Sequence, residues 1–172
     1  MAIFAIAPQR NFAPMKTQTT LRWLNFALFG LALWFFGNLY EEVILMPNWL
    51  VAPLDVLQAY NRYYTVVIQY HYYVPITQVA VIVLIVCCFT ANPARQQAGR
   101  DLGRAAIWGT IALVLTAWIV LSLNLDLFIG QLTLTETEAH RKGLIWMLGN
   151  GVRLICVGLS LWYTIRVRDA IR

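Results

Sequence analysis

The sequence contains too few charged residues for a protein that is surrounded by water. Lysine, arginine, aspartate and glutamate make up only 12% of its 172 residues, and 60% of the residues are hydrophobic. Soluble domains carry about 25% charged residues, and half that share cannot cover a water-facing surface. We therefore predict a single membrane domain whose surface is largely covered by lipid.

Several motifs that would identify an enzyme class are missing. The three cysteines, Cys87, Cys88 and Cys156, form no CxxC pair, which excludes a dithiol oxidoreductase, and we interpret them as soft fillers of the core. Histidine, cysteine and acidic residues do not recur at metal-ligand spacings, and there is no glycine-rich phosphate loop. The sequence predicts neither a metal site nor a cofactor, and we interpret His140 as a solvated loop residue.

Four apolar runs are long enough to cross a bilayer, which takes about 20 helical residues. They cover residues 21–45, 74–91, 105–127 and 142–165. These runs predict an all-α bundle of four transmembrane helices within residues 21–166. Residues 1–20 and 167–172 are then the terminal tails. We detect no internal repeat.

Proline and polar residues mark the expected ends of the spans. The first span is expected to stop at Met46-Pro47-Asn48, because the residue before a proline disfavours helical backbone. Pro75 suits the first turn of the second span, where its missing N–H group costs little, and Asn92-Pro93 closes that span. Thr135-Glu136-Thr137-Glu138 has the composition of a capped helix start.

The connection between the first two spans contains a further predicted helix. Pro53 can begin this helix, since proline is well tolerated in a first turn. Apolar side chains then recur at helical spacing at Leu54, Leu57, Tyr60, Tyr64 and Val67. We expect this segment to lie at the outer membrane surface and to approach the second span with a break near Pro75.

Lysine and arginine are distributed unequally over the two sides of the predicted bundle. Nine lie in the tails, at the span ends next to them and in the loop between the second and third spans, and three lie on the opposite side. Such residues concentrate in cytoplasmic loops, so we expect both termini in the cytoplasm and a multi-pass protein of the bacterial inner membrane. The net charge of +5 then reflects topology, and it does not indicate nucleic-acid binding.

Arg153 is the most informative residue of the predicted spans. It lies eleven residues past Lys142, which is about 16 Å into the membrane at 1.5 Å per helical residue. A charge at this depth is costly unless it has a partner, and such residues mark functional sites by default. Its side chain should reach outward, and Asn150 and Trp146 share its helix face.

Candidate partners for Arg153 occur in the outer halves of the other spans. Those with acidic, amide or imidazole groups are Asn38, Glu41, Glu42, His71 and Asn124. We expect them to form one polar layer with Arg153 that opens toward the outside. In this layer the candidate catalytic residues are Glu41, Glu42 and Arg153. The candidate ligand-binding residues are Trp34, Asn38, His71, Asn124, Trp146 and Asn150.

The same groups could serve packing alone. Buried polar side chains also join helices to one another, at about 0.6 kcal/mol for each interhelical hydrogen bond. Glycines, which allow close helix contacts, occur in the first and fourth spans at Gly30, Gly37, Gly143, Gly149, Gly151 and Gly158. The sequence leaves a ligand site and helix fastening as equal alternatives for the polar layer.

Three segments give the chain a resemblance to a known family. An acidic turn and a proline end the first span, in NLYEE and PNW, and LNLDLFIG and WMLGNGVR lie in the third and fourth spans. From about Leu21 to Arg166, this pattern resembles the small four-helix membrane proteins that include fungal anthrone oxygenases. The resemblance implies a cofactor-independent oxygenase that acts on a reduced aromatic polyketide, although most bacterial members have no assigned reaction.

Three functions are compatible with the sequence. In the first, a lipophilic aromatic molecule enters from the bilayer, Arg153 and Asn150 hold its oxygen, and Glu41 or Glu42 acts as a base. A quinone or an isoprenoid would fit equally well. In the second, the chain is an assembly partner without a ligand. In the third, it is a transporter or channel subunit at the axis of a homo-oligomer, which the apolar inner halves of the spans disfavour.

Overall fold

The computed structural model describes residues 16–67, 70–91, 96–129 and 134–172. The regular elements in these ranges are helices. Most of the predicted N-terminal tail lies outside the described residues, as does the predicted stop of the second span at Asn92-Pro93.

Four helical segments are long and apolar enough to cross a membrane, which confirms the predicted all-α, four-span fold. They cover Thr17–Val51, Tyr70–Thr90, Gln96–Phe128 and Glu136–Ile171. The third and fourth helices begin before the predicted span starts at residues 105 and 142, in polar sequence. The fourth helix has 36 residues, or about 54 Å, so its polar ends project beyond a hydrocarbon core of about 30 Å.

Most spans combine more than one helical element. The elements are α1 (Thr17–Tyr40), η1 (Glu41–Leu45), α2 (Met46–Val51), α3 (Pro53–Tyr63), α4 (Tyr70–Tyr73), α5 (Ile76–Thr90), α6 (Gln96–Ile119), η2 (Val120–Ile129) and α7 (Glu136–Ile171). The two η elements are π-helical. The helix predicted between the first two spans is confirmed as α3, although Tyr64 and Val67 lie beyond its end and are exposed.

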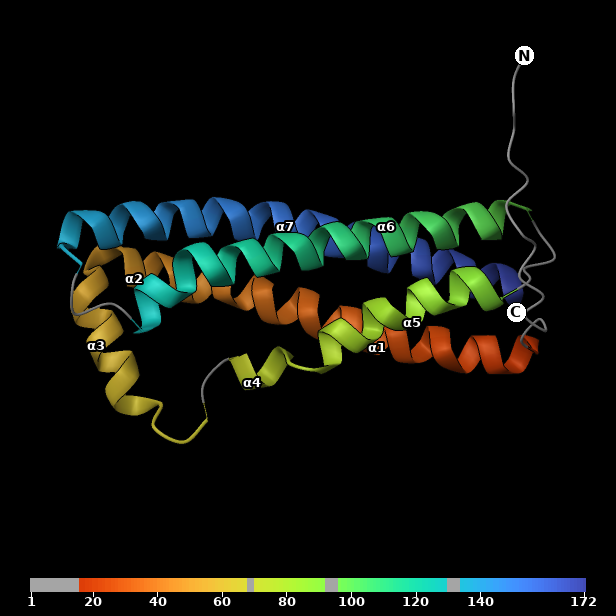
Figure 1. Cartoon of the computed structure of the whole chain (residues 1–172), viewed down its shortest axis with the longest axis horizontal. Coiled ribbons are helices and arrows are strands. Elements are labelled where there is room, and N and C mark those ends of the chain that lie inside the picture. Colours follow the sequence, from red (N-terminus) through yellow and green to blue (C-terminus); the bar gives the residue numbers. More distant parts are fainter. Residues whose placement is uncertain (1–15, 68–69, 92–95, 130–133) are drawn as a thin grey trace, which may run out of the picture.

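The four spans form a ring in which each packs against two neighbours. Helix α1 contacts α5 and α7, and α6 closes the ring against the same two helices. Figure 1 shows the spans along the long axis of the molecule. We call the end with α2, α3, η2 and the start of α7 the α3 end. The opposite end, with the start of α1 and the end of α7, is the terminal end.

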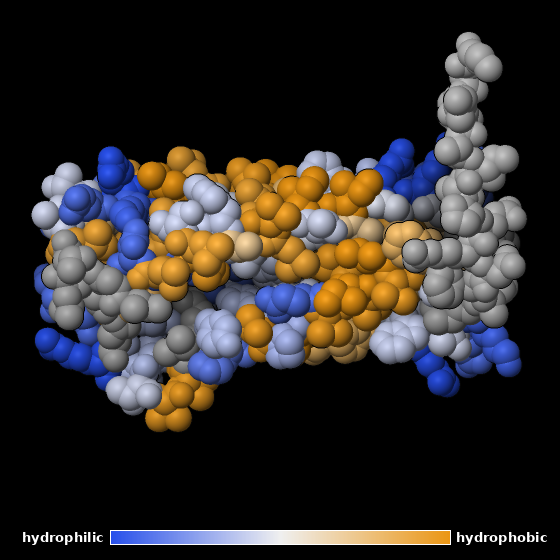
Figure 2. All heavy atoms as spheres, viewed as in Figure 1, coloured by the Kyte–Doolittle hydropathy of each residue, from blue (hydrophilic) through white to orange (hydrophobic). Residues whose placement is uncertain are grey.

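Apolar side chains occupy both the inside of the ring and its outer surface. Leu31 and Val157 are fully buried where the spans meet, whereas Phe36 and Ile155 on the same helices are more than 60% exposed. Figure 2 shows apolar side chains over the middle of one face and hydrophilic side chains at both ends. An apolar belt of this kind is covered by lipid. The chain is therefore a multi-pass membrane protein.

Glycines allow close contacts at several predicted positions. A Cβ atom at Gly30 would lie 2.6 Å from the Cβ atom of Ala80, and one at Gly143 would lie 2.3 Å from the ring of Trp49. No side chain fits at these distances, so α1 packs directly on α5, and the Trp49 ring lies against the backbone of α7. The prediction of a close contact is wrong for Gly151, where only one atom lies as near as 4.0 Å.

The predicted stop at Pro47 is wrong, because the first helix continues to Val51. In η1 the N–H group of Met46 donates to the carbonyl of Glu41, five residues earlier. This π-turn inserts one residue into the helix and leaves Pro47 in the first turn of α2, where a missing N–H group breaks no hydrogen bond. Pro75 precedes α5 as its N-cap residue and does not lie in its first turn.

The start of α7 is capped as predicted. The Thr135 hydroxyl accepts from the N–H group of Glu138 at 3.3 Å, and the Glu138 carboxylate accepts from the N–H group of Thr135 at 2.9 Å. Next to this cap, α3 packs against α7, and Leu57 is buried in an apolar cluster at the α3 end. This cluster fixes α2 and α3 against the fourth span.

Candidate functional site

Arg153 lies in the middle of α7 and is only 6% exposed. Its Nε atom donates to Oδ1 of Asn150 at 3.1 Å, and Nη2 donates to Oδ1 of Asn38 at 2.9 Å. Nη1 donates to Oγ1 of Thr116 at 3.4 Å. The guanidinium also lies 5.9 Å from the centre of the Trp146 ring, within the range of a cation–π interaction. Side chains of α1, α6 and α7 thus hold this cation inside the bundle.

Asn150 connects the guanidinium to a carboxylate. Its side chain is fully buried. Its Nδ2 group donates to Oε2 of Glu42 at 2.6 Å and to the backbone carbonyl of Asn38 at 3.3 Å, while Oδ1 accepts from Arg153. Both Glu41 and Glu42 also lie within electrostatic reach of Arg153. One amide therefore orients a cation, an anion and the backbone of the first span.

The π-turn η1 directs two consecutive acidic side chains toward the other spans. Consecutive residues of an α-helix diverge by about 100° around its axis, at 3.6 residues per turn, and the wider π-turn reduces this angle. Glu41 is buried, whereas Glu42 is partly exposed. Such π-turns inside long helices occur frequently at functional sites.

Two members of this cluster were not among the predicted site residues. The hydroxyl of Tyr73 donates to Oε1 of Glu41, so the second span contributes through α4. Thr116, which bonds Arg153, is a polar residue within an apolar run of α6. A polar residue at this depth in a predicted span could have indicated Thr116 as a site residue from the sequence alone. The sequence did not single out Tyr73, because several tyrosines stand close together there and tyrosine is common at membrane interfaces.

The other predicted site residues, Trp34, Asn124 and His71, make no direct hydrogen bond to the guanidinium among those found in the described residues. Trp34 is buried in an apolar core that α1, α5, α6 and α7 form together. Asn124 is linked to the cluster through Trp146, whose Nε1 atom donates to its Oδ1 atom at 2.8 Å. His71 is exposed on α4, where its ring stacks edge-on against Tyr70. We define the Arg153 cluster as Asn38, Glu41, Glu42, Tyr73, Thr116, Trp146, Asn150 and Arg153.

Two features show that the Arg153 cluster is neither fully hydrogen-bonded nor fully packed. The Nδ2 group of Asn38 is buried and lacks a hydrogen-bond partner among the described residues. On α7, the nearest atom to a Cβ built at Gly151 is Oε1 of Glu42, 4.0 Å away. The absence of a side chain at Gly151 therefore leaves open space beside the Glu42 carboxylate, between the first and fourth spans.

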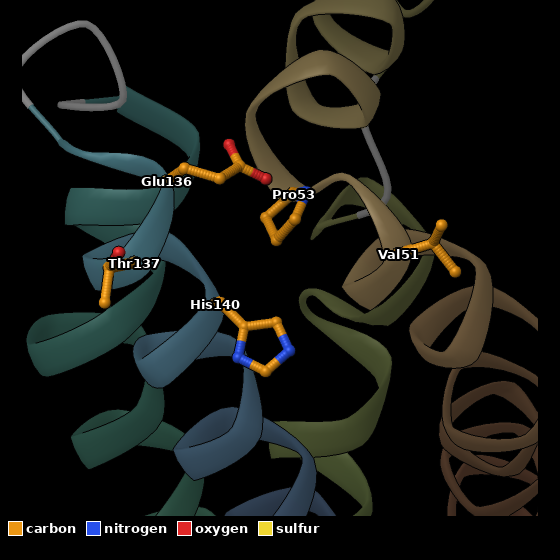
Figure 3. A pocket seen from close by; sticks show the side chains of 5 residues that line it. All are labelled: Val51, Pro53, Glu136, Thr137 and His140. Carbon is orange, nitrogen blue, oxygen red and sulfur yellow. The ribbon is translucent and has the colours of Figure 1, made fainter.

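A separate pocket of about 390 Å³ lies at the α3 end. Its lining residues are Val51, Pro53, Glu136, Thr137 and His140. Figure 3 shows the His140 ring and the Glu136 carboxylate extending from α7 toward the corner between α2 and α3. Oε2 of Glu136 accepts from the N–H group of Leu54 at 3.3 Å. His140 is exposed, as expected, but its assignment to a loop is wrong, because it lies in α7.

The comparisons with known proteins assign no family to this chain. No protein-family model matches it, and neither a curated protein nor a solved structure matches it. Within the described ranges, no three histidine, cysteine or acidic side chains are placed to hold a metal ion. The resemblance to anthrone oxygenases stays a prediction.

Proposed function

We propose that the chain binds a lipophilic aromatic molecule with a carbonyl or phenol oxygen at the Arg153 cluster. The observation that carries this proposal is the partly exposed carboxylate of Glu42, which adjoins a buried cation and faces the bare backbone of Gly151. A cluster that only joined helices would gain from a side chain at this position, because it would fill the space between the spans.

The chemistry of the cluster suits a ligand that develops negative charge on oxygen. The free N–H bonds of Asn38 Nδ2 and the neighbouring guanidinium would stabilise an oxyanion in surroundings that exclude water. Glu42 is the base with access to the ligand, since a hydrogen bond from Asn150 holds it in place while one side stays open. The ligand would enter from the bilayer, between α1 and α7.

The resemblance noted in the sequence adds a reaction to this binding site. Anthrone reacts with dioxygen to give anthraquinone and water, so its CH₂ carbon loses two hydrogens and gains one oxygen atom. The second oxygen atom leaves as water, and no further oxidant is needed. Glu42 would remove the first proton from carbon, and Asn38 and Arg153 would hold the resulting phenolate-like oxygen.

Leucine at position 151 tests the site without removing any member of the cluster. We expect Gly151→Leu to abolish retention of anthraquinone in native mass spectrometry of protein in mild detergent. Gly103→Leu is the matched control, because a Cβ atom there would have no neighbour within 4 Å. If Gly151→Leu retains anthraquinone as well as the control does, the proposed entry and binding site are refuted.

Glu42→Gln separates binding from reaction. Its amide keeps the size of the side chain but cannot take a proton, so we expect anthraquinone to be retained while oxygen consumption with anthrone falls by about 10²–10⁴-fold. Unchanged oxygen consumption would refute the role of Glu42 as a base. It would leave the binding site itself intact, because Gly151→Leu tests that part separately.

Helix fastening is the second candidate function of the cluster. The hydrogen bonds from Arg153 to Asn38, Asn150 and Thr116 favour it, because they engage Nε and both terminal nitrogens within the protein. The chain would then be a structural or assembly partner without a ligand. In that case no lipophilic compound would co-purify with the wild type, and Gly151→Leu would not change the retention of any small molecule.

We infer that the terminal end faces the cytoplasm of a bacterial inner membrane. The described basic residues at this end are Lys16, Arg22, Arg100, Arg104, Arg166, Arg168 and Arg172, against Arg62, Arg141 and Lys142 at the α3 end. In a variant without native cysteines, Thr137→Cys should react with an impermeant maleimide on intact spheroplasts, and Arg172→Cys should not. The reverse pattern would contradict this orientation.

A further inference from the structure

Another buried charge lies at the terminal end, far from the Arg153 cluster along the spans. Asp101 on α6 is only 2% exposed, although the sequence placed it in a loop between the second and third spans. Its Oδ1 atom accepts from Gln97 Nε2 at 3.0 Å and from Arg104 Nη1 at 3.0 Å. Its Oδ2 atom lies 3.2 Å from Nε of Arg166 on α7. One carboxylate thus joins two arginines from neighbouring spans.

The two arginines keep most of their hydrogen-bonding capacity. Arg166 lies closest to Asp101 through its Nε atom, and its terminal nitrogens donate no hydrogen bond to a described residue, so both are available. Arg104 uses one terminal nitrogen, and its guanidinium lies 5.6 Å from the centre of the Tyr163 ring. Their side chains are 50% and 47% exposed for Arg104 and Arg166, respectively. The trio carries one surplus positive charge at the surface.

An exposed tryptophan places this surplus charge at the level of lipid headgroups. Trp162 is 57% exposed on α7, one turn before Arg166. Tryptophan collects where the hydrocarbon core meets the headgroups. Arg166, which lies one turn closer to the terminal end, is then at the depth of the phosphates.

We propose that Arg104 and Arg166 bind the phosphodiester of an anionic phospholipid, and that Asp101 positions their guanidiniums. Guanidinium groups match phosphate oxygens in paired hydrogen bonds. The buried carboxylate offsets the repulsion between the two cations and fixes their separation across α6 and α7. The surplus charge favours a headgroup with a net negative charge over a zwitterionic headgroup, whose own ammonium cancels the phosphate.

Lipid retention in native mass spectrometry tests this proposal. The full chain in mild detergent would be titrated with phosphatidylglycerol, with phosphatidylcholine and, as the free anion, with inorganic phosphate. We expect phosphatidylglycerol to be retained at a concentration at least tenfold lower than phosphatidylcholine. Equal retention of the two lipids would overturn the proposal. Loss of bound phosphatidylglycerol at millimolar phosphate would also overturn it, because the site would then recognise a free anion.

Three variants assign the preference to these arginines. The double variant Arg104→Gln/Arg166→Gln should lose the tenfold preference for phosphatidylglycerol. Arg168→Gln is the control. Arg168 lies two residues after Arg166 on α7, but it is paired with Asp169 at 2.8 Å, so this variant should keep the preference. If Arg168→Gln lost as much of the preference as the double variant, the effect would come from charge alone and the proposed site would be refuted.

The third variant, Arg104→Lys/Arg166→Lys, tests the proposal even if Arg104→Gln/Arg166→Gln does not fold. It keeps both positive charges and their pairing with Asp101 but removes the paired N–H groups, so we expect the preference to fall at least threefold. A preference equal to that of the wild type would refute recognition by guanidinium groups.

Discussion

Replacement of Asn150 by leucine removes the side chain that holds a buried cation and a carboxylate together. Leucine has the same number and branching of side-chain heavy atoms, but it offers neither the acceptor that Arg153 uses nor the donor that Glu42 uses. Hydrogen bonds to charged groups contribute about 1.5–3 kcal/mol each. With two of them lost, we expect Asn150→Leu to lower the free energy of unfolding by about 3–6 kcal/mol.

The free cysteines of the chain provide the assay. Cys87 and Cys156 are buried and Cys88 is partly buried, so a maleimide dye that fluoresces on reaction with thiols reports unfolding in detergent. A loss of 1 kcal/mol shifts the melting temperature by about 2–4 °C for a chain of this size. The melting temperature of Asn150→Leu should therefore fall by about 6–24 °C.

Thr116→Val is the matched control for this variant. It removes a single hydrogen bond to the same guanidinium. At 3.4 Å this bond is longer than the usual range of about 2.7–3.2 Å, so it is weaker than the bonds of Asn150, and we assign it the membrane average of about 0.6 kcal/mol. Its melting temperature should fall by no more than about 3 °C. A fall of similar size in Asn150→Leu would refute the conclusion that Asn150 holds the cluster together.

Three further variants test other parts of the structure with the same melting assay. Gly143→Ala places a methyl group against the ring of Trp49, and overpacking of this kind costs about 1–3 kcal/mol. Tyr73→Phe removes a donor from the buried carboxylate of Glu41 and should cost about 1.5–3 kcal/mol. Thr135→Ala removes the N-cap of α7 and should cost about 1 kcal/mol.

Each of these variants has a control at a comparable position. Gly103→Ala adds a methyl group where no atom lies within 4 Å. Tyr72→Phe alters the neighbouring tyrosine, which is 52% exposed, and Thr137→Ala alters an exposed threonine two residues after the cap. We expect each control to melt within about 2 °C of the wild type. A variant that matches its control would contradict the contact assigned to it.

Much of the fold could be predicted because it is encoded locally. Apolar runs of membrane length, the cap at Thr135 and the periodic positions after Pro53 each depend on neighbouring residues in the sequence. The continuation past Pro47 could not be predicted, because it depends on a π-turn. The helical state of Asp101 was also missed, since polar sequence was taken as a loop, and its buried position depends on Arg166 more than sixty residues away.

The candidate site was predictable in its centre and not at its margins. A charge in the middle of a span requires partners, and this requirement led from Arg153 to Asn38 and Asn150. Tyr73 was missed because a tyrosine at the membrane interface has an ordinary explanation. The space beside Gly151 was missed for a different reason: glycine in a span predicts a close contact as readily as an opening, and only the positions of the neighbouring helices decide which of them occurs.

The π-turn at Glu41–Leu45 also determines where this long helix can change its length. A π-turn holds one residue more than an α-helical path between the same two points. Deletion of a single residue there would shorten the chain and leave Asn38 before it and Trp49 after it on their present faces. The same deletion elsewhere in α1 would rotate everything beyond it by about 100°. The segment that carries both acids is thus the stretch of the first span where a lost residue leaves the register of the bundle unchanged.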